Sequence, residues 1–312
     1  MSLTLVGQRQ ADVPMQVLLD LARATDPGVL PVLTEVRRSD VGGSPYTLHD
    51  PGAPLDLSAR LGPRDVLILY IPGRSTGGVE VSRPKGEPFH LRCLSFSTDA
   101  DYDLAWSLAQ QMTHLLGVPF VTDVGKAVDG PPTGDWRQEH RAATFKRLAA
   151  VFARQGTSFL QTPVRPFWAG PRVWQAANRK VDRFTQMVTD LVRVGSGYRV
   201  SGVETPARVQ VRPVKRSFGI FRRRQVVEAE QCLLERPCLV AEAQRILLAL
   251  EDTRWILLWN DFIRVADPWL TWLDDRQAVL RLPRGGEETF VEEVSRAAES
   301  QYQAPASSVG AT

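Results

Sequence analysis

The stretch that most constrains the fold runs from Phe89 to Val121 and predicts a strand, a helix and a strand. The helix over residues 98–116 has clear ends, because Thr98 and Asp101 have the spacing of a capping box and Gly117 supplies a stop. Its apolar residues recur at helical spacing: Leu104, Ala105, Leu108, Ala109, Met112, Leu115 and Leu116. The flanking runs are short, apolar and β-rich, so we expect the helix to lie across a sheet to which they belong.

Three acids crowd the start of this helix, namely Asp99, Asp101 and Asp103. A calcium loop would need Gly at its sixth position and Glu at its twelfth. Those positions hold Leu104 and Gln110. Because the helix dipole favours negative charge in the first turn, the pattern indicates an acidic helix start and no metal site.

Apolar patterns predict further elements on both sides of this stretch. Residues 65–72 predict a central strand, and VEVS at residues 79–82 predicts the middle strand of a meander that leads into the Phe89 strand. Residues 26–64 are rich in Pro and Gly and predict loops. The remaining expectations are irregular or extended chain at 158–170, helices at 136–155, 171–194, 241–250 and 287–298, and strands at 198–204, 207–214, 224–235, 255–259 and 277–283.

These elements predict an α+β fold class with mixed or antiparallel sheets, packed helices and two subdomains. Residues 126–135 (KAVDGPPTGD) have the composition of a linker. They separate an N-terminal α+β domain, residues 1–125, from a C-terminal α+β domain, residues 136–300. Residues 301–312 form a small-residue tail that we expect to be disordered.

The bulk composition indicates a globular cytoplasmic protein. The net charge of +3 predicts no general attraction to nucleic acid or membrane. Three cysteines without a metal-ligand pattern predict a reducing compartment and no zinc site. Met1–Gln10 lacks the apolar segment of a secretory signal, and no apolar run approaches the ~18 residues needed to cross a bilayer.

One motif suggests catalysis, since residues 73–77 (GRSTG) match the G-x-S-x-G pattern of a nucleophile elbow. The elbow needs a helix after the serine, and the chain continues into the VEVS strand, so a hairpin turn explains the glycines. A serine hydrolase using Ser75 is therefore only a third hypothesis. The phosphate-loop, dinucleotide, HExxH and CxxC patterns are absent from the sequence, so we assign no catalytic residue, cofactor or metal.

The sharpest binding candidate is a basic hairpin over residues 208–224. Its cations surround Phe218 and Phe221 with no acid among them: Arg208, Arg212, Lys215, Arg216, Arg222, Arg223 and Arg224. Arginines around aromatic rings can bind phosphates and stack on bases. The alternative is a charged strand that is solvated or paired with Glu228 and Glu230, which follow directly.

A tryptophan cluster gives a second candidate for partner binding. Trp255, Trp259, Trp269 and Trp272 lie close in sequence, and core packing is their default role. If Trp269 or Trp272 were exposed, they would instead suggest the anchors of a protein interface.

The order of elements resembles a family of uncharacterised bacterial proteins of similar length, which carry a domain of unknown function. The resemblance covers about half of the chain. It rests on the VEVS strand, the helix with Asp99-x-Asp101 and Ala105-Trp106, and the later RPFWAG and QAVLRLP segments. It implies a bacterial cytosolic α+β protein and supplies no catalytic residue.

These observations favour a non-enzymatic, cytosolic binding protein of bacterial type that acts on another protein, such as an immunity or accessory factor. Nucleic-acid binding through residues 208–224 is the alternative from a different class. A membrane partner is not expected.

Overall fold

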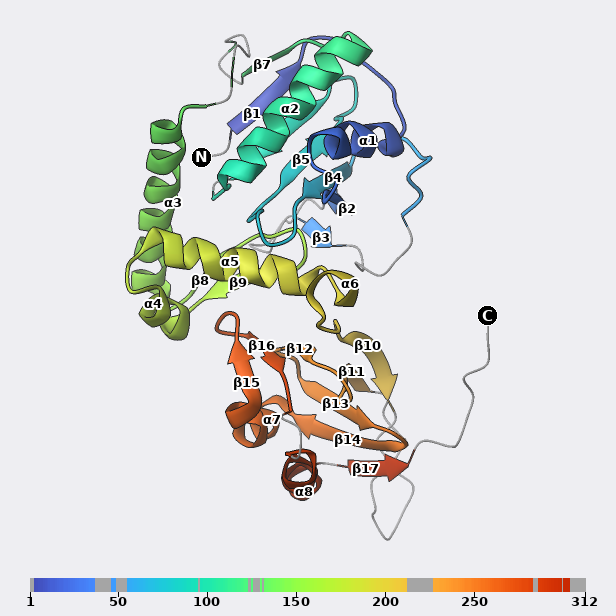
Figure 1. Cartoon of the computed structure of the whole chain (residues 1–312), viewed down its shortest axis with the longest axis vertical. Coiled ribbons are helices and arrows are strands. Elements are labelled where there is room, and N and C mark those ends of the chain that lie inside the picture. Colours follow the sequence, from blue (N-terminus) through green and yellow to red (C-terminus); the bar gives the residue numbers. More distant parts are fainter. Residues whose placement is uncertain are drawn as a thin grey trace. The chain divides into compact units, whose positions relative to one another are not determined.

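The computed structural model describes residues 3–36, 46–48, 55–94, 96–122, 125, 130, 132–211, 227–282, 286–298 and 300–303 (Figure 1). The chain forms two compact units, Met1–Ser196 and Gly197–Thr312. Both units combine helices with antiparallel or mixed sheets, which confirms the α+β fold class. None of the helices in the described part of the chain has the length and apolarity needed to cross a membrane.

The first unit is built on a seven-stranded antiparallel sheet with the order β3-β2-β4-β5-β6-β1-β7. The bounds of its strands are β1 Leu3–Gly7, β2 Leu30–Val36, β3 Tyr46–Leu48, β4 Asp65–Tyr70, β5 Val79–Ser82, β6 His90–Cys93 and β7 Phe120–Thr122. The strands β4, β5 and β6 are neighbours, as the meander predicted. The prediction of loops throughout residues 26–64 was wrong for β2, which pairs with β4 and is held by that partner despite the surrounding Pro and Gly.

Two helices, α1 (Met15–Thr25) and α2 (Asp99–Leu116), cover one face of this sheet (Figure 1). The predicted capping box is present, and Gly117 ends α2 in the left-handed conformation with φ 64°. Leu104, Leu108 and Met112 of α2 are almost fully buried in the core between helix and sheet. Burying each such side chain stabilises the fold by about 2 kcal/mol.

The rest of the first unit forms a helical layer with a small hairpin. Its elements are α3 Gly134–Gln155, β8 Ser158–Leu160, β9 Phe167–Ala169, α4 Pro171–Ala177 and α5 Val181–Gly195. The single helix expected over 171–194 is broken, because Asn178 and Arg179 adopt positive φ values of 47° and 57°. The stretch 158–170, expected to be irregular or extended, contains the two-stranded hairpin β8–β9.

The division between the units falls after α5. The sequence predicted it at residues 126–135, part of which lies outside the described residues. The helices that follow that segment belong to the first unit, because Phe184 of α5 packs edge-on against Phe96 with ring centroids 5.3 Å apart. Val192 of the same helix packs on Ile68 and Tyr70, on the face of the sheet opposite α2.

The second unit holds a five-stranded sheet with the order β10-β11-β13-β14-β17 and a three-stranded sheet with the order β12-β16-β15. The bounds of its elements are α6 Tyr198–Ser201, β10 Ala207–Val211, β11 Val227–Leu233, β12 Cys238–Ala241, β13 Arg245–Leu250, β14 Thr253–Leu258, α7 Trp259–Ala266, β15 Leu270–Trp272, β16 Gln277–Leu280, α8 Glu287–Ala297 and β17 Ser300–Gln303. The pairing of β11 with β13 is parallel and makes the larger sheet mixed. Its core includes Trp255, Phe262 and Phe290.

Three expectations for the second unit need correction. The helix expected over 241–250 is wrong, because the apolar run RILLAL forms β13 between two strands, and short apolar runs fit a buried strand as well as a helix. The strand expected at 198–204 contains the short helix α6, set between Gly197 and Gly202 at positive φ. The expected tail 301–312 begins within β17, which pairs with β14, and its residues after 303 lie outside the described part.

Candidate functional site

The glycine-rich turn at residues 73–78 connects β4 to β5 as a hairpin. Ser75, the serine of the G-x-S-x-G pattern, is fully buried, and its Oγ accepts a hydrogen bond from the N–H of Ile71 at 2.8 Å. A nucleophile elbow would need an accessible serine and a helix directly after it. Here the turn continues into a strand, so the geometry gives Ser75 a structural role.

Asp101 ties this turn to the start of α2. Its fully buried carboxylate accepts backbone N–H bonds from Thr76 at 3.2 Å, from Gly78 at 3.2 Å and from Thr98 at 2.9 Å. Hydrogen bonds to an ionised acceptor are stronger than neutral ones, and here they satisfy three backbone donors at once. The sequence predicted the cap to Thr98, but the contacts to the turn depend on the sheet and were missed.

The other two acids of the first turn face α3. Asp103 Oδ1 accepts from Arg137 Nη2 at 2.7 Å, and Asp99 Oδ1 accepts from Arg141 Nη1 at 3.3 Å. These ion pairs account for the acidic helix start. Among the described residues, no group of three or more His, Cys, Asp or Glu side chains could hold a metal ion.

A hydrogen bond between Tyr102 and His140 also joins α2 to α3. Tyr102 Oη and His140 Nδ1 lie 2.7 Å apart, and the ring of Trp136 stacks on the imidazole with centroids 4.9 Å apart. Burial is the main cause that raises the pKa of the Tyr102 hydroxyl. The phenol therefore remains neutral at ordinary pH and holds α3 against α2.

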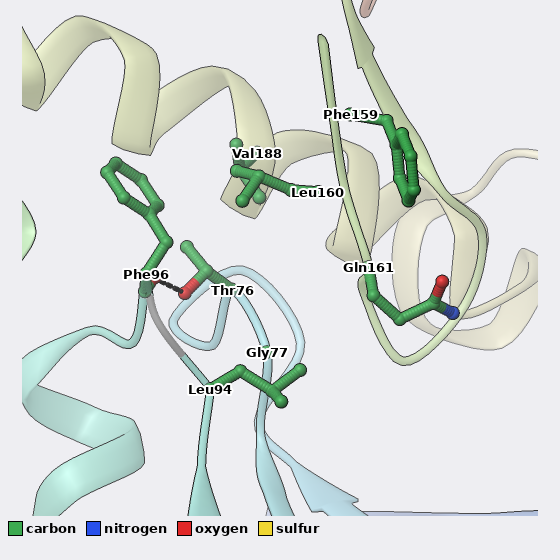
Figure 2. Close-up of a pocket in the computed structure, with 8 residues that line it drawn as sticks. All are labelled: Thr76, Gly77, Leu94, Phe96, Phe159, Leu160, Gln161 and Val188. Atoms are coloured by element: carbon green, nitrogen blue, oxygen red, sulfur yellow. Dashed lines mark hydrogen bonds between the residues drawn. The ribbon is translucent and has the colours of Figure 1, made fainter. Parts of the chain in front are cut away.

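A pocket with a volume of about 130 Å³ lies beside the hairpin β8–β9 (Figure 2). It is lined largely by apolar side chains, and none of its lining residues is titratable. Leu94 and Phe96 come from the segment before α2, Leu160 from β8 and Val188 from α5. With Thr76 and Gly77 of the β4–β5 turn, the fold thus brings together four separate segments around a space that suits an uncharged, apolar group.

An aromatic pair lies on the hairpin next to this pocket. Phe159 and Trp168 are directly opposite each other on β8 and β9, with ring centroids 5.3 Å apart. Phe159 is 46% exposed although it is large and apolar. Figure 2 shows it on the side of β8 opposite to Leu160, as strand alternation requires. Neither ring is marked by a binding motif in the sequence.

Cations gather around the same elements. Residues 142–181 contain seven Lys or Arg residues and no Asp or Glu. Trp174 of α4 packs between Phe145 and Phe152 of α3, at 5.1 and 5.5 Å, so the two helices are held side by side. We define the basic–aromatic surface by the exposed cations of these helices and the aromatic pair: Lys146, Arg147, Arg154, Arg172, Phe159 and Trp168. The acid-free run is visible in the sequence, and the fold places its cations on α3, on α4 and in the segments next to β8 and β9.

The basic hairpin that the sequence favoured falls mostly outside the described residues. Arg208 is in β10, where its backbone position is opposite Glu230 of β11. The other members lie outside the described part of the chain: Arg212, Lys215, Arg216, Phe218, Phe221, Arg222, Arg223 and Arg224. Their role in binding stays a prediction.

The two candidate tryptophans lie against the core of the second unit. Trp269 and Trp272 are both partly buried and pack on that core. The ring of Trp269 meets the fully buried Phe290 edge-on at 5.1 Å, and Trp272 Nε1 donates to Asp267 Oδ1 at 3.4 Å. These contacts favour the core-packing role over that of interface anchors.

Comparison with protein-family models, with curated proteins and with solved structures found no match for this chain.

Proposed function

We propose that the chain is a non-enzymatic protein-binding module that takes an apolar side chain of its partner into the pocket beside β8. The observation that carries the proposal is the pocket beside β8, which is lined largely by apolar side chains and lies next to the exposed residue Phe159. Much of the binding energy of protein interfaces comes from a few side chains that fill well-packed pockets on the partner.

The chemistry of the pocket supports binding of a side chain. Its volume of about 130 Å³ is on the scale of a single aliphatic side chain. Its walls hold no charged group that would pair with an ionic ligand or move a proton. The described cysteines Cys93, Cys232 and Cys238 are free and buried, which supports a cytoplasmic location for this module.

The test fills the pocket with the Leu94→Trp variant and matches it with Leu115→Trp. Leu94 lines the pocket and is partly exposed, whereas Leu115 is 61% exposed on α2. Both tagged variants and the wild type are used for affinity capture from the native lysate, with and without nuclease, and the captured proteins are quantified by mass spectrometry. We expect one stoichiometric protein that survives nuclease, is retained by Leu115→Trp and is lost by Leu94→Trp.

Equal retention by both variants would contradict binding at the pocket. A partner that disappears with nuclease would contradict direct protein binding. Circular dichroism and thermal melting of each variant separate loss of binding from loss of folding.

A further inference from the structure

The cations of the basic–aromatic surface have a chemistry that the proposed protein-binding function does not use. Seven cations occur in residues 142–181 without a single acid, in a chain that has nearly equal numbers of Lys plus Arg (38) and Asp plus Glu (35). Solvated charged faces normally mix both signs. A long described segment of one sign therefore points to an anionic ligand.

The fold places two of these cations near one end of the hairpin. Arg154 lies near the end of α3, shortly before β8 begins, and Arg172 lies at the start of α4, shortly after β9 ends. Ser158 and Ala169 are paired at that end of β8 and β9, so the two arginines flank it together. Packing of Trp174 against Phe152 holds α4 to α3 at the same place.

The exposed face of α3 suits close approach by a chain of phosphates. Arg147, Ala150 and Arg154 are spaced by three and four residues, so they lie along one side of the helix, and all three are exposed. The short side chain between the arginines leaves both guanidinium groups accessible. Arginine presents a planar fork of donors that matches phosphate oxygens.

We propose that the basic–aromatic surface binds single-stranded nucleic acid, with the phosphates on the cations of α3 and α4 and the bases on Phe159 and Trp168. A positively charged surface beside exposed aromatic rings is the general design of sequence-tolerant single-strand binding. An acidic protein would need the cations alone, whereas the exposed ring of Phe159 beside the partly buried Trp168 favours a ligand with flat rings. The proposal goes beyond the protein-binding function and does not depend on it.

The test measures fluorescence anisotropy of the full chain with labelled oligothymidylate and oligouridylate of about 20 nucleotides, which is longer than a typical single-strand site. Binding is compared at roughly 50 and roughly 200 mM NaCl, because phosphate contacts lose affinity steeply over that range. The charge variant is Arg147→Glu/Arg154→Glu. Its matched control is Arg64→Glu/Lys85→Glu, which changes two exposed cations elsewhere in the same unit and shifts the net charge equally.

We expect the charge variant to bind at least roughly tenfold more weakly at the lower salt concentration, and the control to stay close to wild type. The slope of log affinity against log salt should fall by about 1.4, because each phosphate contact to a single strand contributes about 0.7. Phe159→Ala should weaken binding roughly five- to hundredfold, and Phe159→Tyr should restore it, since stacking needs only the ring.

Several outcomes would overturn the proposal. One is the absence of binding by the folded wild type, and another is an equal loss in the control variant. A third is displacement of the oligonucleotide by polyglutamate together with no effect of Phe159→Ala, which would identify a surface for acidic proteins. If Arg147→Glu/Arg154→Glu failed to fold, Arg147→Gln/Arg154→Gln would serve in its place, and unchanged affinity in that variant would equally count against the proposal.

Discussion

The helices α2 and α3 have the same kinds of caps at their ends but differ in how many of the residues between the caps are buried. Each begins at a threonine cap, Thr98 or Thr133, and each ends at a glycine in the left-handed conformation, Gly117 or Gly156. Along α2, eight residues are buried, and most of them are apolar. Along the longer α3, the buried residues whose burial is described are only Arg137, Thr144 and Phe145.

The difference shows which residues packing selects. The sheet and α1 decide the composition of α2, because its apolar face must fill the core. Much of α3 touches solvent, so packing does not explain why its exposed charges have one sign after residue 141. The residues at the helix ends therefore reflect local capping interactions, and the residues between the ends reflect what each helix packs against.

Between matched substitutions in α2 and α3, the largest difference in stability should come from the N-terminal caps. Asp101→Ala leaves three backbone N–H groups without their buried acceptor, and we expect a loss of about 3–6 kcal/mol in the free energy of unfolding of the first unit. Thr133→Ala removes one exposed cap bond and should cost about 1 kcal/mol or less. Urea unfolding followed by circular dichroism measures both. Similar losses in the two variants would remove the distinction between the helices.

The next largest difference in stability should come from substituting one leucine in each helix. Leu108 of α2 is fully buried, so Leu108→Ala should lower the free energy of unfolding by about 2–5 kcal/mol. Leu148 of α3 is only partly buried, and Leu148→Ala should cost about 1 kcal/mol. The same urea titration checks both values. A cost at Leu148 equal to that at Leu108 would mean that α3 is packed as closely as α2.

The contact between the two helices should make stability depend on alkaline pH. Burial raises the pKa of Tyr102 in the folded state, so above about pH 10 the unfolded chain loses a phenol proton that the folded chain keeps. Stability from this group is complete below that pH and falls by up to about 1.4 kcal/mol per pH unit above it. Tyr102→Phe should remove that part of the slope, measured by urea unfolding between about pH 9 and pH 11. Burial also raises the pKa of Tyr70 and Cys93, so some slope should persist. An unchanged slope in Tyr102→Phe would show that α3 does not shield this phenol.

The smallest effect on stability should come from the cations of α3. Arg147→Glu/Arg154→Glu changes exposed side chains, so each substitution should alter the free energy of unfolding by about 1 kcal/mol or less, with the larger part at Arg154 in the last turn of α3. Thermal melting beside the wild type checks this. A large destabilisation would show that these arginines serve the fold, in contrast to their proposed role in binding.

Local signals predicted much of the fold. The cap at Thr98, the stop at Gly117 and the meander β4–β5–β6 each depend on short-range patterns, and the structure contains them. The errors came where tertiary contacts decided the outcome. The run RILLAL is a strand because β11 and β14 pair with it, and β2 forms among prolines and glycines because β4 offers it a partner.

The candidate site was harder to predict. The pocket combines Leu94, Leu160 and Val188 from segments far apart in the chain, and none of these residues belongs to a recognisable motif. The acid-free run of cations could have been counted in the sequence. The pairing of Phe159 with Trp168 and the packing of α4 on α3 through Trp174 depend on the folded chain.

The carboxylate of Asp101 has a consequence for how the first unit opens. Because one side chain holds the amides of Thr76, Gly78 and Thr98, the hairpin turn and the helix start cannot loosen one at a time without breaking shared bonds. We expect these three amides to exchange their hydrogens with solvent in a single cooperative opening and to show one common protection free energy. Clearly different protection at the three positions would refute this coupling. If the three amides do share one protection free energy, the turn and the helix start behave as one element of the folding landscape. The bond between Gly78 and Asp101 shows that these two segments are more than 20 residues apart in the sequence.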